Sequence, residues 1–592
     1  NAAEDDIEEE ILDRDHIDIL VTTPEKLDLL IRDNHSSLRN LKLAIMDEAH
    51  NIMEKNRGSK FELVLSTIKQ RRDDVRFLLL SPFIKNADKI AKWLGDTEMD
   101  STAISLNWSP TKQYIGCNLL KINRTKSTVM YFPSDRNNII THPIEVDMNI
   151  DPHDMKDRLN IDRFDYRVKN TILLERYIEL GTVMVLCRGS GTCQNLAQKS
   201  LNYLKDNDKL KDMSDDEDIK KAIEVIRLEN TEDDPLIECL KYGVAYHHSR
   251  LSALVKETIE ELIRKNKIKI ITATTTLAQG MNFPITTVIF ETTRLGGRDL
   301  TGAEFWNIAG RAGRTYKDKE GHIITPYTQS QINSKRMAQR YIRESIKELI
   351  SSLTDFFENI EDVIEINYSL IRENTAISNF LQYLNHILRV SYQYNLDEID
   401  IMKVKNMLNT SLVYKELEWE SGYMESQEKI DSFVFSYLEH LKDSNTGQLT
   451  KADLFGVSDI SFNVFSSAVR NLRSQIVNED NFKASKVILE NRDIDYLSKI
   501  VKVLASVPEI KLDIFGQGQF RPESVAKIVI GWVHGDGVND IAEQVKDWNA
   551  DYSEVLGKCY EYINGKLKSF IPWGISMYQD LTDDLVDEDA KN

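Results

Sequence analysis

Short apolar runs separated by polar segments of helical length fill the first 330 residues. IDILVTT (17–23), LKLAIMDEAH (41–50) and VRFLLLSP (75–82) have the length and unbroken hydrophobicity of strands buried on both faces of a parallel sheet. A second group has the same character: GTVMVLCRGSGT (181–192), YGVAYHHS (242–249), IKIITATTT (268–276), TTVIFETT (286–293) and GHIITPY (321–327). The pattern predicts two α/β units with parallel sheets.

Beyond about residue 330 the strand pattern gives way to apolar residues at three- and four-residue spacing. FLQYLNHILRVSYQYNL (380–396) and IDYLSKIVKVLASV (494–507) predict long amphipathic helices. The expected organisation is a first α/β part over 1–110, a polar connection over 111–170 and a second α/β domain over 171–330. A helical or winged-helix-like region would follow over 331–440, then a helical bundle over 441–592 with an acidic tail that frays.

Composition narrows the class of protein. A chain of 592 residues is long enough for several domains, and its net charge of -20 argues against coating nucleic acid by bulk attraction, though not against a local basic track. The five cysteines form no CxxC pair, so we expect reduced thiols, no structural zinc and a cytoplasmic protein. No apolar stretch approaches the length of a membrane span.

The first candidate site follows the second predicted strand. Asp47, Glu48 and His50 stand where an apolar run stops, and ligands lodge at the carboxyl ends of strands in open α/β sheets. One carboxylate there can hold Mg²⁺ while the other polarises an attacking water. The alternative is a solvated turn with incidental acids.

VTTPEKLDLL (21–30) offers a second candidate. Thr23 can cap a helix and Pro24 suits its first turn, which leaves backbone amides that favour an anion such as a phosphate. An ordinary well-capped helix explains the same residues.

EFWNIAGRAGR (304–314) is the most specific of the patterns. Arg311 and Arg314 are three residues apart, so on a helical turn both guanidinium groups would project the same way, with Gly310 and Gly313 leaving that face open. Two such groups suit a triphosphate whose charge grows in the transition state; surface salt bridges are the alternative. ITATTTLAQGMNFP (271–284) is a polar loop that can bond phosphates without reading bases.

The order of these segments resembles a known family. TTPEK, DEAH, LLLSPFIKNADKIAKWLG, GTVMVLCRGSGT, GVAYHHSRL, ATTTLAQGMNFP and NIAGRAGR are similar to motifs Ib to VI of superfamily-two DEAD/DEAH-box helicases, in the Ski-like branch. The resemblance covers roughly residues 17 to 325. It implies two RecA-like domains with the nucleotide between them, followed by helical accessory domains.

The resemblance assigns roles by position. Asp47 would hold Mg²⁺ through water, Glu48 would activate the hydrolytic water, and His50 would couple the nucleotide to the other domain. The remaining roles are arginine fingers at Arg311 and Arg314, nucleotide contacts at Gly280, Asn282, Asn307 and Gly310, and strand contacts at Thr23, Pro24, Arg188, Thr274 and Thr276.

Three departures from the family qualify this assignment. Ser81, Pro82 and Phe83 replace the usual Ser-Ala-Thr, and His247 to Leu251 read His-His-Ser-Arg-Leu where His-His-Ala-Gly-Leu is common. We interpret the paired histidines as packing residues rather than metal ligands. No GxxxxGK[ST] phosphate loop occurs in the chain, and we expect that the natural protein carries this loop in an upstream segment.

The resemblance implies an ATP-dependent translocase or helicase on single-stranded nucleic acid, with ATP and Mg²⁺ as cofactors. DNA is favoured over RNA, because the chain has no room for the large inserted arch of RNA-exosome relatives. Genome maintenance or anti-phage defence of the Hachiman type is the expected setting, with a nuclease or other effector as a partner. The alternative is a hydrolysis-deficient nucleic-acid-binding scaffold.

Overall fold

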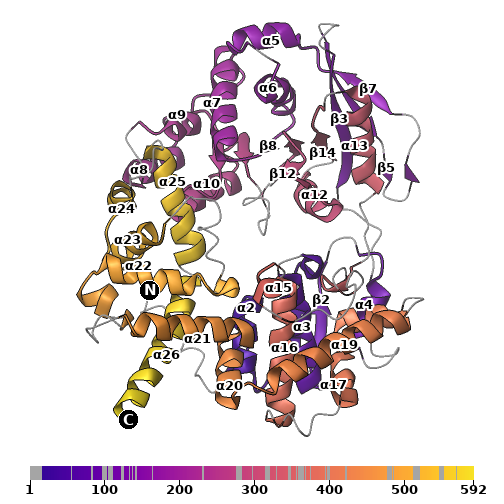
Figure 1. Cartoon of the computed structure of the whole chain (residues 1–592). Helices are drawn as coiled ribbons and strands as arrows, with labels where there is room; N and C mark the ends of the chain where they lie inside the picture. The colour runs from indigo at the N-terminus through magenta and orange to yellow at the C-terminus, as the bar shows by residue number, and fades with distance from the viewer. Residues whose placement is uncertain are drawn as a thin grey trace. The chain divides into compact units, whose positions relative to one another are not determined.

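The computed structural model divides the chain into two compact units (Figure 1). The first contains Asn1–Ser105, Glu348–Asp536 and Lys566–Asn592, and the second contains Leu106–Lys347 and Gly537–Gly565. The structure describes residues 17–591 apart from 55–56, 82–83, 96–102, 105–110, 122–125, 133, 136–137, 140–142, 163, 230–232, 275–282, 284, 296–297, 314–319, 329, 344–348, 355–356, 358–365, 367, 374, 394, 396–400, 420–422, 476–482, 485, 511–520, 546–551 and 568–569.

Two parallel strands form the α/β part of the first unit. β1 (Leu43–Met46) pairs in register with β2 (Arg76–Leu79), as the apolar runs predict. The accompanying helices are α2 (Pro24–Arg32), α3 (Gly58–Arg71) and α4 (Ala87–Leu94). The strand predicted at 17–23 is wrong, because these residues form no ladder with β1 or β2 and stay irregular up to the start of α2.

One face of this small sheet is open. Strands of parallel sheets are normally covered on both faces. Here one set of alternating side chains is exposed, at Leu43 (48%), Ile45 (60%), Leu78 (44%) and Leu80 (46%), while Met46 on the other set is buried. We call these four residues the open apolar face.

The helical half of the chain shares its core with the first α/β part. Leu63 of α3 packs into the cluster formed by α16 (Thr375–Tyr392) and α19 (Tyr423–Leu441). Leu349 and Leu412 pack with Met46 and Trp93 in a second cluster. The regions expected as separate domains at 1–110, 331–440 and 441–592 thus contribute to one compact unit, apart from residues 537–565, which belong to the second unit.

The helices of this half confirm the predicted amphipathic segments. They are α15 (Tyr368–Glu373), α16, α17 (Ile401–Leu408), α18 (Leu412–Trp419), α19, α20 (Thr446–Phe455), α21 (Asp459–Arg473), α22 (Ile494–Leu504), α23 (Pro522–Val533) and α26 (Phe570–Lys591). α26 extends through the acidic tail to Lys591.

An eight-stranded sheet organises the second unit, in the order β7-β4-β3-β14-β11-β8-β10-β9. Its parallel core contains β8 (Val183–Leu186), β9 (Val244–His247), β10 (Ile270–Ala273), β11 (Thr287–Phe290) and β14 (Glu320–Thr325), all predicted from the sequence. These strands are buried along their length, apart from the first residue of β14, as their unbroken hydrophobicity requires.

The polar connection expected over 111–170 is wrong. β3 (Lys112–Lys121) joins the sheet parallel to β14, and β4 (Lys126–Phe132) and β7 (Ile144–Asp147) extend it antiparallel. Helices α5 (Pro152–Arg158) and α6 (Tyr166–Tyr177) complete this segment. Polar residues of this segment are buried within the strands, among them Asn118, Ser127 and Thr128, so local polarity did not indicate their place in the sheet.

Helices surround the parallel strands of the second unit. They are α7 (Ser190–Asp206), α8 (Glu217–Glu229), α9 (Pro235–Lys241), α10 (Ala253–Arg264), α12 (Gly302–Ala309) and α13 (Gln331–Arg343), joined late in the chain by α24 (Val538–Gln544) and α25 (Tyr552–Tyr562). The Tyr560 hydroxyl donates to the Glu229 carbonyl oxygen at 3.1 Å, which fixes α25 against α8. The fold class is α/β with parallel sheets and a largely helical second half, as predicted. No helix in the described part of the chain is long and apolar enough to cross a membrane.

Candidate functional site

The acidic turn after β1 is tied to the end of β2. The Ala49 amide donates to the Leu80 carbonyl oxygen at 2.8 Å, and the Leu80 amide donates to the Met46 carbonyl oxygen at 2.9 Å. These bonds bring the acidic turn beside Leu80 and Ser81, the two residues that follow β2. The candidate acids therefore meet, at one edge of the sheet, the segment where the sequence departs from the family pattern.

Glu48 takes an unusual backbone conformation at this edge. Its φ of 52° and ψ of 46° lie in the left-handed region, which residues other than glycine seldom occupy. Its amide donates to Asp47 Oδ1 at 2.9 Å. Outliers of this kind occur often at functional sites, where the surrounding structure holds them in place.

His50 faces the Glu48 carboxylate. Its Nδ1 lies 3.2 Å from Glu48 Oε2, without the angles of a hydrogen bond, and the His50 side chain is nine-tenths buried. Burial lowers the pKa of His50, and the nearby charges of Glu48 and Asp47 offset this only in part. A neutral imidazole beside the carboxylate leaves the charge of Glu48 uncompensated, as a general base requires.

The chemistry of the turn fits a magnesium nucleotide. Asp47 is exposed at the strand end, and Mg²⁺ prefers carboxylate oxygens, water and phosphate oxygens as ligands. Among the described residues there is no cluster of three or more histidine, cysteine or acidic side chains that holds a metal by itself. Because Mg²⁺ is usually held by one or two carboxylates together with substrate phosphates, a lone Asp47 suits it.

Helix α2 begins as predicted. Thr23 is its N-cap, with Oγ1 accepting from the Lys26 amide at 3.3 Å, and Pro24 occupies the first turn. Glu25 in that turn accepts two hydrogen bonds from Arg57, at 2.8 and 3.2 Å. The start of α2 thus has the capped geometry expected for a phosphate contact, together with an acid that is neutralised by an arginine.

The carboxyl ends of the parallel strands in the second unit bring together the other predicted strand contacts. Arg188 follows β8 and is exposed, and Thr274 follows β10, the next strand in the sheet. The Arg188 amide donates to Glu291 Oε2 at 3.2 Å, and the Thr274 amide donates to the His247 carbonyl oxygen at 3.1 Å. Two residues from different motifs therefore share the edge where ligands lodge in α/β sheets.

The paired histidines are packing residues, as interpreted from the sequence. His247 Nε2 lies 3.2 Å from Glu260 Oε1, and His248 stacks on Tyr246 with ring centroids 5.6 Å apart. Burial lowers the pKa of His247 to about 3 and that of His248 to about 4. Both rings are therefore neutral near pH 7.

The glycine-arginine motif lies at the opposite edge of the second sheet. The Gly313 amide donates to the Ile285 carbonyl oxygen at 2.9 Å, just before β11, and Gln113 Nε2 donates to the carbonyl oxygens of Gly310 and Ala312 at 3.2 and 2.9 Å. Both Ile285 and Gln113 lie at the amino ends of their strands. Arg311 therefore stands at a different edge from Arg188 and Thr274.

The helical turn expected through Arg311 is wrong. Helix α12 ends at Ala309 with Gly310 as its C-cap, and Gly313 has a φ of 87°. A Cβ on Gly313 would lie 2.5 Å from Thr111 Cγ2, so glycine is required here by its conformation and by its neighbours. Asn307 is half-buried on α12.

Four predicted site residues lie outside the described residues: Thr276, Gly280, Asn282 and Arg314. Two residues in these neighbourhoods were missed by the sequence analysis. Glu291 directly follows the β11 run, so its place after a strand was a signal of the same kind as that of Asp47. Gln113 had no local signal, because its role depends on the pairing of β3 with β14.

Comparison with known proteins agrees with this geometry. Residues 1–89 match the DEAD/DEAH box helicase family, and residues 205–316 match the helicase conserved C-terminal domain. These matches contain the acidic turn and the start of α2 in one unit, and Thr274 and Arg311 in the other. Each unit of the chain therefore contains a segment that is similar to the DEAD/DEAH-box helicases.

Particular relatives extend the similarity over most of the chain. The Hachiman protein HamB of Bacillus cereus is 25% identical over 584 residues, which are 92% of this chain and 50% of that protein. The ATP-dependent DNA helicases Hel308 of Methanocella arvoryzae and Thermoplasma volcanium are 28% and 30% identical over 52% and 55% of the chain. The matched segments are 37% and 41% of those two proteins, so the chain spans half or less of the length of these relatives.

Proposed function

We propose that this chain is the motor portion of an ATP-driven translocase that moves along single-stranded nucleic acid. The observation that carries the proposal is the acidic turn, where Glu48 is fixed in a left-handed conformation beside a buried His50 at the meeting point of β1 and β2. The two segments that match helicase families support ATP as the nucleotide.

Glu48 is the proposed general base. Its carboxylate accepts a proton from the water that attacks the γ-phosphate, and Asp47 holds the nucleotide's Mg²⁺ through water. The Mg²⁺ ion supplies positive charge next to the phosphates. Arg311 and Arg314 stabilise the negative charge of the transition state, while Gly280, Asn282, Asn307 and Gly310 line the nucleotide site.

Thr23, Pro24, Arg188, Thr274 and Thr276 are the proposed contacts to the strand. Capped helix starts and strand-end hydroxyls bond phosphate oxygens without reading bases, so binding is independent of sequence. The position of Arg188 and Thr274 at the same edge of their sheet supports a continuous backbone path.

The proposed hydrolysis requires a phosphate-gripping loop. The chain holds no GxxxxGK[ST] motif, and the open apolar face of β1 and β2 (Leu43, Ile45, Leu78 and Leu80) is the surface on which a further α/β segment of the same lobe would pack. We propose that a segment with the phosphate loop covers this face. The matched segments are only 50% of HamB and 37% of the Methanocella arvoryzae Hel308, so both relatives are longer than this chain, which supports this proposal.

DNA is the proposed natural strand, and anti-phage defence the proposed setting. Two relatives bear the name of DNA helicases, and the relative that matches 92% of the chain is a Hachiman protein. A nuclease or other effector is the proposed partner in this setting.

The decisive experiment measures ATP hydrolysis by the natural full-length protein with and without single-stranded DNA. Glu48→Gln should abolish strand-stimulated hydrolysis while nucleotide binding is kept, because the amide is similar in shape but accepts no proton. Glu54→Gln, which changes an exposed acid six residues further on, is the matched control and should hydrolyse normally. Unchanged turnover in Glu48→Gln would overturn the proposed role, and a wild-type protein that binds strands without hydrolysis would be the scaffold of the alternative hypothesis.

A further inference from the structure

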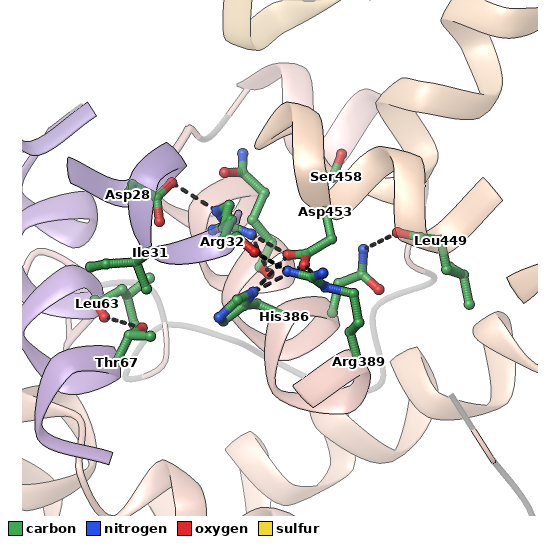
Figure 2. A network of polar contacts seen from close by, with 12 residues as sticks. Asp28, Ile31, Arg32, Leu63, Thr67, His386, Arg389, Leu449, Asp453 and Ser458 are labelled. Atoms are coloured by element: carbon green, nitrogen blue, oxygen red, sulfur yellow. Dashed lines mark hydrogen bonds and ion pairs between the residues drawn. The ribbon is translucent and has the colours of Figure 1, made fainter. Parts of the chain in front are cut away.

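A cluster of buried charges connects α2 to the helical half of the first unit (Figure 2). Arg32 stands in the last turn of α2, Asp453 belongs to α20, and His386 and Arg389 belong to α16. Arg32 is 4% exposed and Asp453 is fully buried. Charged side chains are seldom buried to this extent unless they are paired, so each partner is essential to the others.

Asp453 is the centre of the cluster. Its Oδ1 accepts from Arg32 Nη1 at 2.5 Å, and its Oδ2 accepts from Arg389 Nε and lies 3.0 Å from His386 Nδ1. Burial opposes the charge on this carboxylate, but Arg32, His386 and Arg389 outweigh it and lower the pKa of Asp453. Asp453 is therefore ionised, and both of its oxygens are engaged.

His386 joins a third helix to the cluster. Arg71 Nη2 of α3 lies 2.7 Å from His386 Nε2, and because arginine only donates, Nε2 must be the acceptor. His386 therefore carries its proton on Nδ1, which donates to Asp453. Arg71 Nη1 also donates to the Ile31 carbonyl oxygen at 2.6 Å, so the same arginine holds the end of α2.

The last turn of α2 is thus held from several sides. Arg32 Nε pairs with Asp28 at 3.0 Å, Lys60 of α3 pairs with the same Asp28 at 2.8 Å, and Arg389 of α16 donates to the Arg32 carbonyl oxygen. The Arg32–Asp28 pair lies within α2, whereas the contacts to Lys60, Arg389 and Asp453 cross to other helices and would be broken by a displacement of α2 along its axis. The nine residues of α2 span about 14 Å, so the constraint reaches the opposite end, where Thr23 and Pro24 lie.

We propose that Asp453 is a positioning residue for strand binding: through Arg32 it fixes α2, and so places the capped start of that helix for a backbone phosphate. The inference rests on the proposed function, because it assigns Thr23 and Pro24 to the strand. It adds that the helical half of the chain affects strand binding indirectly, because α20 holds α2 in place.

The first test is Asp453→Asn, which keeps the shape of the side chain and removes its charge. Binding of fluorescent single-stranded DNA should weaken by about tenfold without nucleotide, as expected when a coupled contact of ordinary size is lost. Asp459→Asn is the matched control. Asp459 is equally buried in the same unit. It accepts from the Tyr437 hydroxyl at 2.7 Å and lies 3.1 Å from His440 Nε2. Both partners belong to α19 and neither to α2.

Both variants should lower the melting temperature, but only Asp453→Asn should weaken strand binding. Equal binding losses in the two variants would show that Asp453 has a structural role alone and would overturn the inference. If Asp453→Asn does not fold, Arg389→Gln replaces it. This side chain is 24% exposed, and its loss removes the hydrogen bonds to Asp453 and to the Arg32 carbonyl oxygen that hold the last turn of α2, so strand binding should still weaken.

A double-mutant cycle with Thr23→Ala separates positioning from general damage. If Asp453 acts by placing the start of α2, Thr23→Ala should have little further effect once Asp453→Asn is present. If the double variant lost strand affinity by the product of the two single losses, Asp453 and Thr23 would act independently, which would contradict the positioning role. A wild-type protein that binds no single strands would overturn the proposed function and this inference with it, an outcome distinct from normal binding with equal losses in both aspartate variants.

Discussion

Single residues fix the acidic turn through close backbone contacts. Glu48 leaves β1 in a left-handed conformation, which costs about 1 to 3 kcal/mol and persists only where the surroundings hold it. The bonds of Ala49 and Leu80 supply this support. The turn is thus kept in place by the chain on both sides of the acid that carries the proposed chemistry.

At Gly58, the start of α3 lies in close contact with the backbone that follows the acidic turn. A Cβ at this position would lie 1.9 Å from the Ile52 carbonyl oxygen, which cannot move without the turn. Gly58→Ala should therefore destabilise the protein by about 1 to 3 kcal/mol, measured by urea denaturation. Gly447→Ala is the control: the atom nearest to its Cβ is the tip of Asn445 at 3.2 Å, and a loss as large there would exclude the steric reason.

Arg311 should matter for hydrolysis rather than for strand binding. In the natural protein, Arg311→Ala should slow ATP hydrolysis by about three orders of magnitude, because a finger acts on transition-state charge. Single-strand affinity without nucleotide should change little, since Arg311 lies at a different edge of the sheet from Arg188. Arg298→Ala, which removes an exposed arginine paired with Glu304, is the control. Equal losses of hydrolysis and affinity would contradict the finger role.

At the scale of elements, Glu62 joins α3 to the start of α18. It is fully buried, accepts from the Val413 amide at 2.8 Å and from Ser351 Oγ, and burial outweighs these hydrogen bonds to raise its pKa to about 7. The Glu62 carboxylate of α3 thus accepts a hydrogen bond at the start of α18. Because burial raises its pKa, its contribution to the free energy of unfolding depends on pH.

The sign of this dependence follows from proton binding. Between the ordinary pKa of 4.5 and the folded value of about 7, the folded chain binds more protons at Glu62 than the unfolded chain, so stability falls as pH rises through this window. Glu62→Gln should remove a pH-dependent loss of about 3 kcal/mol between these limits. Urea denaturation across this range measures it. Glu418→Gln, an exposed acid on α18, should keep the wild-type slope, and an unchanged slope in Glu62→Gln would refute the assignment.

At the scale of the whole molecule, the open apolar face is a group of neighbouring exposed hydrophobic side chains of the kind that marks a packing or binding surface. Ile45→Thr keeps a residue suited to strands and reduces the apolar surface. On this chain alone it should leave the melting temperature nearly unchanged and lower the binding of a hydrophobic dye. In the natural full-length protein it should weaken nucleotide binding, because the segment with the phosphate loop would pack less well.

The same change distinguishes two explanations of the exposed face. Loss of dye binding with normal nucleotide affinity in the full-length protein would mean that the face is not where that segment packs. A fall in the melting temperature of the isolated chain would mean that Ile45 belongs to the core of this unit, although it is 60% exposed.

Local chemistry determined much of this protein from its sequence alone. Most strand runs, the Thr23 cap and the acids after β1 depend on neighbours a few residues away, and they were found where predicted. The predictions that failed concerned 17–23, 111–170 and the helix through Arg311, where pairing or packing with distant segments overrides local pattern.

Only the tertiary structure decided how distant segments meet. Arg32 and Asp453 are separated by 421 positions, and nothing in the local pattern around either residue marks the other. Their contact exists because a buried charge needs an opposite charge within hydrogen-bonding distance, and only the packing of α2 on α16 and α20 supplies one. The local sequence thus determined which side chains stand at the strand ends. The burial of charged and apolar side chains from distant segments determined where α2 is held.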